Sequence, residues 1–277
     1  MENLNFVHKF DNNKDPRNFV YDAINNNKTV NQPEMNIPKN KLNKASLPTT
    51  VLNTPACGVL NQGNLGSCGP NSLAIASSIC SAGKLNDLCR LYTYFNTQCL
   101  DNDNPLEDNG VTTQNLVKSL QKYSCCPEKY LPYVTQNYLT LPPLNCYQNT
   151  YTLSNVTYSY IQQNSSMLQN LQNNLLNTNN KSQITGVVVG INVYSSFPMN
   201  SKNGIIPIPN ANKEQLLGGH CVAIVGYTVI NNTNYIIFQN SWGTSWGNKG
   251  LGYLPIAYLQ NPNLSECPTV ISFTFVK

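Results

Sequence analysis

Three residues whose types could cooperate in chemistry lie far apart in the chain: Cys68, His220 and Asn240. A thiolate is a nucleophile, an imidazole can take its proton, and an amide oxygen can hold the imidazole in one tautomer. His220 follows Cys68 by 152 positions and precedes Asn240 by 20, so only the fold can bring the three together. Each alone has a plainer interpretation: an inert buried cysteine, a structural histidine and a turn residue. Together they favour nucleophilic catalysis by a cysteine.

The segment around Cys68 reads NQGNLGSCGPNSLA and predicts a turn that becomes a helix. Residues from Pro70 to Ala82 are mostly small or apolar, with proline in the first turn, which is typical of the start of a buried helix. Cys68 is therefore expected at or next to the helix N-terminus, where unpaired N–H groups and the helix dipole favour a thiolate. Gly63 and Gly66 allow the backbone to approach a substrate closely.

His220 and Asn240 are predicted to lie on neighbouring antiparallel strands. The apolar run HCVAIVGYTV begins at His220, the run NYIIFQN ends at Asn240, and the short connection INNT between them suits a hairpin. We expect His220 to open its strand and the Asn240 side chain to reach the imidazole. Trp242 is placed to cover that hydrogen bond from water.

The elements that must position these residues change character along the chain. Further helices are predicted over 86–97, over 112–123 with Thr112 or Thr113 as cap, and over 165–177, and further strands begin at 184 and 269. This order predicts an α+β fold with a helical lobe over about 51–150, a β-rich lobe over about 151–277, and the active site in the cleft between them. Residues 1–50 are polar and interrupted by prolines, which predicts an N-terminal extension, either a surface arm or a short inhibitory propeptide.

Composition narrows the function classes. The chain has 277 residues and a formal charge of +4, with no basic cluster interleaved with aromatic residues, so we expect no nucleic-acid partner. No stretch approaches the roughly 20 apolar residues of a membrane span, and the first residues do not resemble a signal peptide, so we expect an intracellular protein without a membrane partner. The ten cysteines leave reduced thiols and disulfides both open, with thiols favoured. No CxxC pair is present and only two histidines are, so no metal site is predicted.

The segments NQGNLGSC, GGHCVAIVGY and NSWGTSWGNKG resemble, in order and spacing, the three signature segments of papain-like cysteine peptidases. The resemblance implies the two-lobed papain-like fold, with Cys68 as nucleophile, His220 as its base and Asn240 as the residue that orients the imidazole. It also implies that Gln62, six residues before Cys68, supplies a side-chain amide to the oxyanion hole. Such an enzyme needs no cofactor, and we expect a monomer that acts on protein or peptide substrates.

Two positions depart from the usual pattern of that family. Leu65 stands where the family usually has cysteine, which removes a disulfide typical of secreted members, and Gly69 stands where it usually has tryptophan. These departures are similar to a branch with an LGSC motif found in bacteria, archaea and large DNA viruses, which makes packaging in a virion the alternative location. Gly66, Cys221 and Trp242 are expected to contact substrate, with Cys221 near the pocket for the second residue upstream of the cut.

The sequence therefore predicts a cysteine endopeptidase that works through a thioester. The same residues would serve another cysteine-dependent acyl transfer, such as amidase, ligase or deamidase chemistry. A catalytically silent papain-fold binding or virion-structural protein is the alternative from a different class.

Overall fold

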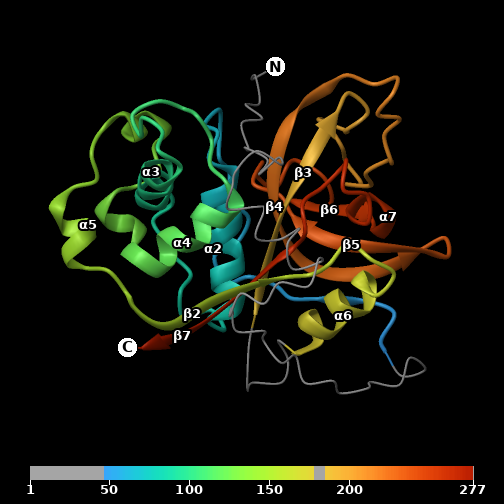
Figure 1. Ribbon diagram of the computed structural model, residues 1–277, viewed down its shortest axis with the longest axis horizontal. Helices are drawn as coiled ribbons and strands as arrows, with labels where there is room; N and C mark the ends of the chain where they lie inside the picture. Colours follow the sequence, from blue (N-terminus) through green and yellow to red (C-terminus); the bar gives the residue numbers. More distant parts are fainter. Residues whose placement is uncertain (1–46, 178–184, 277) are drawn as a thin grey trace, which may run out of the picture.

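The computed structural model describes residues 47–177 and 185–276 (Figure 1). The predicted N-terminal extension, residues 1–50, falls almost entirely outside these ranges. The elements, in chain order, are β1 (Val51–Leu52), α2 (Cys68–Cys80), α3 (Arg90–Asp101), α4 (Thr113–Tyr123), the 3-10 turns η2 (Glu128–Tyr130) and η3 (Thr135–Leu139), α5 (Leu144–Gln148), β2 (Thr152–Tyr160), α6 (Met167–Asn177), β3 (Gly186–Tyr194), β4 (Leu216–Ile230), β5 (Thr233–Gln239), β6 (Leu251–Pro255), α7 (Ile256–Leu259) and β7 (Thr269–Val276).

The strands form one antiparallel sheet in the order β2-β7-β3-β4-β5-β6, with β1 paired to β4. Helices α2 to α5 precede all of these strands except β1. The predicted α+β class is thus confirmed. None of the helices within residues 47–177 and 185–276 is long and apolar enough to cross a membrane.

Helix α2 lies at the centre of the molecule, with helices α3, α4 and α5 on one side and most of the sheet on the other (Figure 1). All of its 13 residues are buried, and it packs against β3, β4 and β7 as well as α3 and α4. At Gly186, the first residue of β3, an added Cβ would lie 2.4 Å from the carbonyl oxygen of Ala76. Because only glycine permits this approach, the helix backbone rests directly on the sheet.

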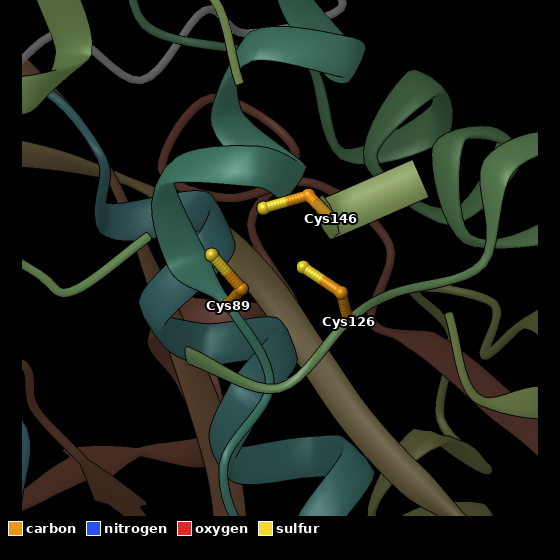
Figure 2. A group of neighbouring side chains, drawn as sticks. All are labelled: Cys89, Cys126 and Cys146. Carbon is orange, nitrogen blue, oxygen red and sulfur yellow. The ribbon is translucent and has the colours of Figure 1, made fainter. Parts of the chain in front are cut away.

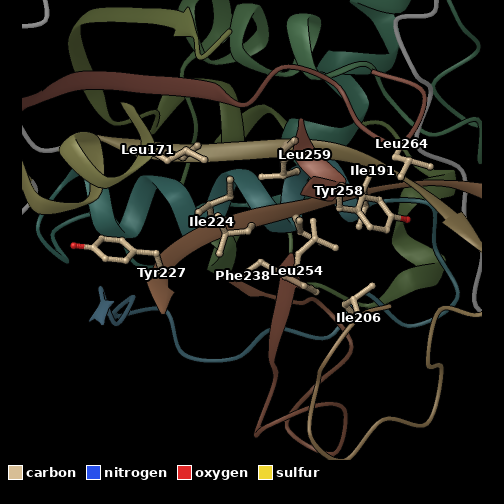
Figure 3. Packing of buried hydrophobic residues seen from close by; sticks show 14 of the residues in the cluster. Leu171, Ile191, Ile206, Ile224, Tyr227, Phe238, Leu254, Tyr258, Leu259 and Leu264 are labelled. Carbon is tan, nitrogen blue, oxygen red and sulfur yellow. The ribbon is translucent and has the colours of Figure 1, made fainter. Parts of the chain in front are cut away.

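Two large hydrophobic clusters form most of the core. The first fills the space between the sheet and helices α6 and α7 (Figure 3), and it includes Leu171, Ile191, Ile206, Ile224, Tyr227, Phe238, Leu254, Tyr258, Leu259 and Leu264. The second joins α2, α3 and α4, and β2 and β7 contribute Val156, Tyr158 and Phe273 to it. Strands from the end of the chain therefore help to build the helical side, so the lobe boundary near residue 150 stays a prediction.

Two boundaries differ from those predicted. Strand β4 begins at Leu216 rather than at His220, because the glycines before the histidine pair with Asn192 and Val193 of β3. Helix α3 begins at Arg90 rather than near residue 86, because residues 87–89 instead pair with 126–128: the Cys89 N–H donates to the Cys126 carbonyl at 2.9 Å, and the Glu128 N–H to the Asp87 carbonyl at 2.8 Å.

Other local predictions are confirmed. The β4–β5 connection is a tight hairpin, and both Asn231 and Asn232 have positive φ, at 47° and 61°, as a type I′ turn requires. Thr112 is the N-cap of α4, since its hydroxyl accepts from the Asn115 N–H at 3.3 Å. The chemistry of short polar residues at a turn and at a helix start was enough to find both.

Close packing explains why residue 69, directly after Cys68, is a glycine. A Cβ added at Gly69 would lie 2.6 Å from Val111 Cγ2, so no larger residue fits beside the start of α4 without a shift. We expect Gly69→Ala to lower the free energy of unfolding by about 1–3 kcal/mol through overpacking. Urea unfolding of the two single variants and of the double variant with Val111→Ala checks this. The double variant should lose less stability than the sum of the single losses, and strict additivity would contradict the proposed clash.

Candidate active site

Cys68 is the first residue of α2, and its side chain is buried. Ser72, one turn further along the helix, donates its hydroxyl to the carbonyl of Cys221 at 2.9 Å. This bond ties the N-terminal turn of α2 to the part of β4 that carries His220. The fold thus joins two segments that are separated by about 150 residues in the sequence.

The imidazole of His220 is held by Asn240. His220 Nε2 lies 2.8 Å from Asn240 Oδ1, and the same oxygen accepts the N–H of Ser241 at 2.9 Å. Because that oxygen only accepts, Nε2 carries the proton, and Nδ1 of the neutral ring is the nitrogen with a lone pair. The Trp242 ring stacks on the imidazole at a centroid distance of 4.8 Å. The structure therefore places Asn240 and Trp242 against His220 as the sequence predicted.

Gln62 joins this group through the backbone. Asn61 and Trp242 form an antiparallel bridge, and the Gln62 N–H donates to the Ser241 carbonyl at 2.8 Å. The Gln62 side chain is fixed at both ends: Nε2 donates to the Leu65 carbonyl at 3.0 Å, and Oε1 accepts the Ser241 hydroxyl at 2.5 Å. An amide nitrogen has two N–H donors, so one remains for another acceptor.

Sequence reasoning missed the carboxylate that holds the loop before Cys68. Asp108 accepts the Gly66 N–H with both oxygens, at 2.9 and 3.1 Å, and the Tyr94 hydroxyl at 2.6 Å. Burial and the neighbouring Asp108 charge raise the pKa of Tyr94 far above its ordinary value, so the phenol remains a donor. Acidic residues are scarce in this chain, but nothing in the local sequence links Asp108 to residue 66.

Arg90 supports the same loop from the other side, and it too was missed. Its Nε and Nη2 both bind the Glu128 carboxylate at 2.7 Å, and Nη1 donates to Asn71 Oδ1 of α2 at 2.8 Å. The guanidinium lies 3.7 Å from the centre of the Tyr133 ring. The Tyr133 hydroxyl is 2.5 Å from Ser67 Oγ and donates to the Gln62 carbonyl at 3.0 Å. The turn that leads into α2 is therefore held by a connected polar network.

The three predicted substrate contacts lie in different settings. The Gly66 backbone is bound by Asp108, and Trp242 covers His220. Cys221 is fully buried beneath α2, and burial together with the nearby Cys68 raises the pKa of its thiol well above the ordinary value. Cys221 is therefore a protonated thiol and no rival nucleophile, and its contact with substrate stays a prediction.

Comparisons with known proteins agree with this geometry. Residues 53–272 match the family model described as papain family cysteine protease. An uncharacterized peptidase C1-like protein of Acanthamoeba polyphaga mimivirus is 29% identical over 222 residues, which are 76% of this chain and 68% of that protein. Peptidase 1 of Psoroptes ovis matches more locally, with 36% identity over 73 residues, 26% of this chain and 22% of its own length.

Among solved structures, xylellain, a cysteine protease from Xylella fastidiosa, superposes with a TM-score of 0.68 at 28% identity, covering 84% of this chain and 88% of its own. The family model spans well over half of the sequence and includes every residue of the site described above. The chain therefore belongs to the papain family of cysteine proteases, and it is a cysteine peptidase with a mixed α+β, papain-like fold.

Proposed function

We propose that this peptidase is an endopeptidase whose nucleophile is Cys68 and whose general base and acid is His220. The observation that carries the proposal is the bond between His220 Nε2 and Asn240 Oδ1, because it leaves Nδ1 to exchange a proton with a thiol. The link from Ser72 to Cys221 supports the proposal, because it joins α2, which begins with Cys68, to the residue next to His220.

The reaction then follows in two acyl-transfer steps. Cys68 gives its proton to His220, the thiolate attacks the peptide carbonyl, and the imidazolium protonates the leaving amine to give a thioester. Water, deprotonated by the same imidazole, hydrolyses the thioester and restores the thiol. Asn240 keeps the ring in one orientation throughout, and Trp242 excludes water from their hydrogen bond.

The oxyanion of each tetrahedral intermediate needs two donors. The backbone N–H of Cys68, at the first position of α2, is one of these two donors in the proposed mechanism. The second N–H of Gln62 Nε2 is the other donor, since its first N–H and its oxygen are both engaged. Each such donor contributes roughly 3 kcal/mol of transition-state stabilisation in comparable acyl-transfer sites.

Labelling with an epoxysuccinyl peptide tests the nucleophile directly. We expect modification at Cys68 near neutral pH and none at Cys80 or Cys221, because burial raises the pKa of the Cys80 thiol to about 11 and that of Cys221 well above its ordinary value. Peptide mapping by mass spectrometry identifies the labelled residue, and the exposed Cys99 serves as the internal reference for simple accessibility. Modification of Cys99 or Cys221 in place of Cys68 would remove the assignment.

The products of a denatured protein substrate separate endopeptidase from other acyl transfers. An endopeptidase leaves internal fragments with new termini, whereas a ligase or a deamidase leaves the chain as long as before or longer. Intact-mass analysis of the digest over time distinguishes these outcomes.

A further inference from the structure

Three cysteines outside the active site form a cluster inside the helical side of the molecule. Cys89, Cys126 and Cys146 are each fully buried, and their sulfur atoms all lie within 4.8 Å of one another. Figure 2 shows the three side chains, which come from three separate segments, with their sulfurs turned toward a common point. All three are thiols in the structure.

The backbone holds these thiols in place before any ligand is present. Cys89 is the N-cap of α3, and its N–H donates to the Cys126 carbonyl at 2.9 Å within the pairing of residues 87–89 with 126–128. Tyr151 adds a bond from its N–H to the Cys125 carbonyl at 2.7 Å, which fixes the same segment from the other side. Two of the three sulfurs are therefore carried by segments that a backbone bridge between Leu88 and Pro127 joins.

The third sulfur is on a short helix, α5, whose Tyr147 ring also meets the buried Tyr92 ring edge-on at 5.0 Å. Helix α5 has five residues, and Cys146 is its one buried residue. Its neighbours Leu144 and Tyr147 are exposed. The one buried side chain of α5 is thus a thiol beside two other thiols, at a position where an aliphatic side chain would serve if packing were the whole requirement.

We propose that Cys89, Cys126 and Cys146 bind a thiophilic divalent cation of the Zn²⁺ class. Zinc–sulfur bonds of about 2.3 Å in tetrahedral geometry place the sulfurs about 3.8 Å apart, which lies within the observed limit. A disulfide would bring only two sulfurs to about 2.0 Å and leave the third without a function, whereas a metal ion uses all three.

Charge and coordination both fit this occupant. One Zn²⁺ displaces three protons from the three thiols into solvent, which leaves the metal–thiolate group with a net charge of −1. The N-terminus of α3, a helix of 12 residues capped by Cys89, favours negative charge at this place. The Cys89 thiol donates to the Leu131 carbonyl at 3.4 Å, so an oxygen lies at the edge of the cluster, and this oxygen or a water molecule would complete the tetrahedron.

The role that follows is structural. The cation would tie α5, the start of α3 and the 126–128 segment together, and the last two carry Arg90 and Glu128 of the network behind the active-site turn. The chain lacks the family's usual cysteine at position 65, so a thiolate–metal site would supply a crosslink on the helical side without an oxidised pair.

Metal titration of the full chain with Cys68→Ala tests the site independently of the proposed function, because the candidate nucleophile is absent. The protein is reduced, stripped of metal and titrated with Cd²⁺, whose thiolate charge-transfer band reports binding. We expect one Cd²⁺ per chain, displacement by Zn²⁺, and an affinity loss of at least ~100-fold in Cys146→Ser. Cys99→Ser, which changes an exposed thiol on the same side of the molecule, should bind as before.

A second measurement needs no further variant. Bound Zn²⁺ should slow alkylation of Cys89, Cys126 and Cys146 and hydrogen exchange of residues 144–148, and leave alkylation of Cys99 unchanged. The proposal is overturned if the reduced chain binds no stoichiometric metal, if Cys146→Ser binds as tightly as its parent, or if Zn²⁺ leaves those three thiols as reactive as before.

Discussion

Replacement of Cys68 by alanine is expected to lower kcat/KM on a peptide substrate by roughly 10⁶, the size of the loss when an acyl-transfer enzyme of this kind loses its nucleophile. The physical reason is that no other thiol can take its place. Cys221, a thiol near Cys68, is fully buried, and its pKa is raised well above the ordinary value. Steady-state hydrolysis of a fluorogenic peptide measures the change.

The control for this variant is Cys99→Ala, which removes an exposed thiol of the same chain and should keep the wild-type rate. Thermal unfolding of both variants separates loss of chemistry from loss of fold. If Cys68→Ala kept more than a small fraction of the activity after purification from other peptidases, the nucleophile would have to be another residue.

The second large effect is expected at Gln62. Gln62→Ala should lower kcat by about 10²–10³ and leave KM nearly unchanged, because the amide donates to an oxyanion that exists only in the transition state. The side chain also makes two bonds within the loop, to the Leu65 carbonyl and from the Ser241 hydroxyl. A loss of activity through disorder of the loop must therefore be separated from the loss of the donor.

Two further variants make that separation. Gln62→Glu keeps an acceptor for the Ser241 hydroxyl but removes the donor and adds a negative charge, so it should be at least as impaired as Gln62→Ala. Ser241→Ala removes the positioning bond and keeps the donor, so a loss of about tenfold or less is expected. A Gln62→Glu enzyme with near wild-type kcat would refute the oxyanion role, whatever its stability.

Local chemistry explains which parts of the fold the sequence could predict. The buried helix after Cys68, the Asn231–Asn232 hairpin and the Thr112 cap each depend on a few adjacent residues. The contact between His220 and Asn240 was within reach because one hairpin joins their strands. By contrast, the start of α3 was predicted wrongly, because it depends on a pairing with residues far along the chain.

The remaining elements depend on distant partners. The residues of strand β2 are half-buried or exposed without a regular alternation, and the strand forms because β7, more than 100 residues later, offers an edge. The Asp108 bond to Gly66 and the Arg90 network likewise join segments with no local signal. The three clustered cysteines are separated by 37 and 20 positions, so a search for closely spaced metal-ligand pairs does not find them.

The hydrogen bond from Ser72 to Cys221 joins α2 to β4, two segments of the chain that are synthesised at different times. Asn240 leaves the site of synthesis 172 residues after Cys68. At about 5–20 residues per second, this interval lasts roughly 10–30 s. During most of that time α2 can fold on its neighbours, but His220, the proposed base, has not yet been made. If the proposed mechanism holds, a nascent chain therefore carries its thiol without its base, and proteolytic activity begins only when the second half of the molecule has been made.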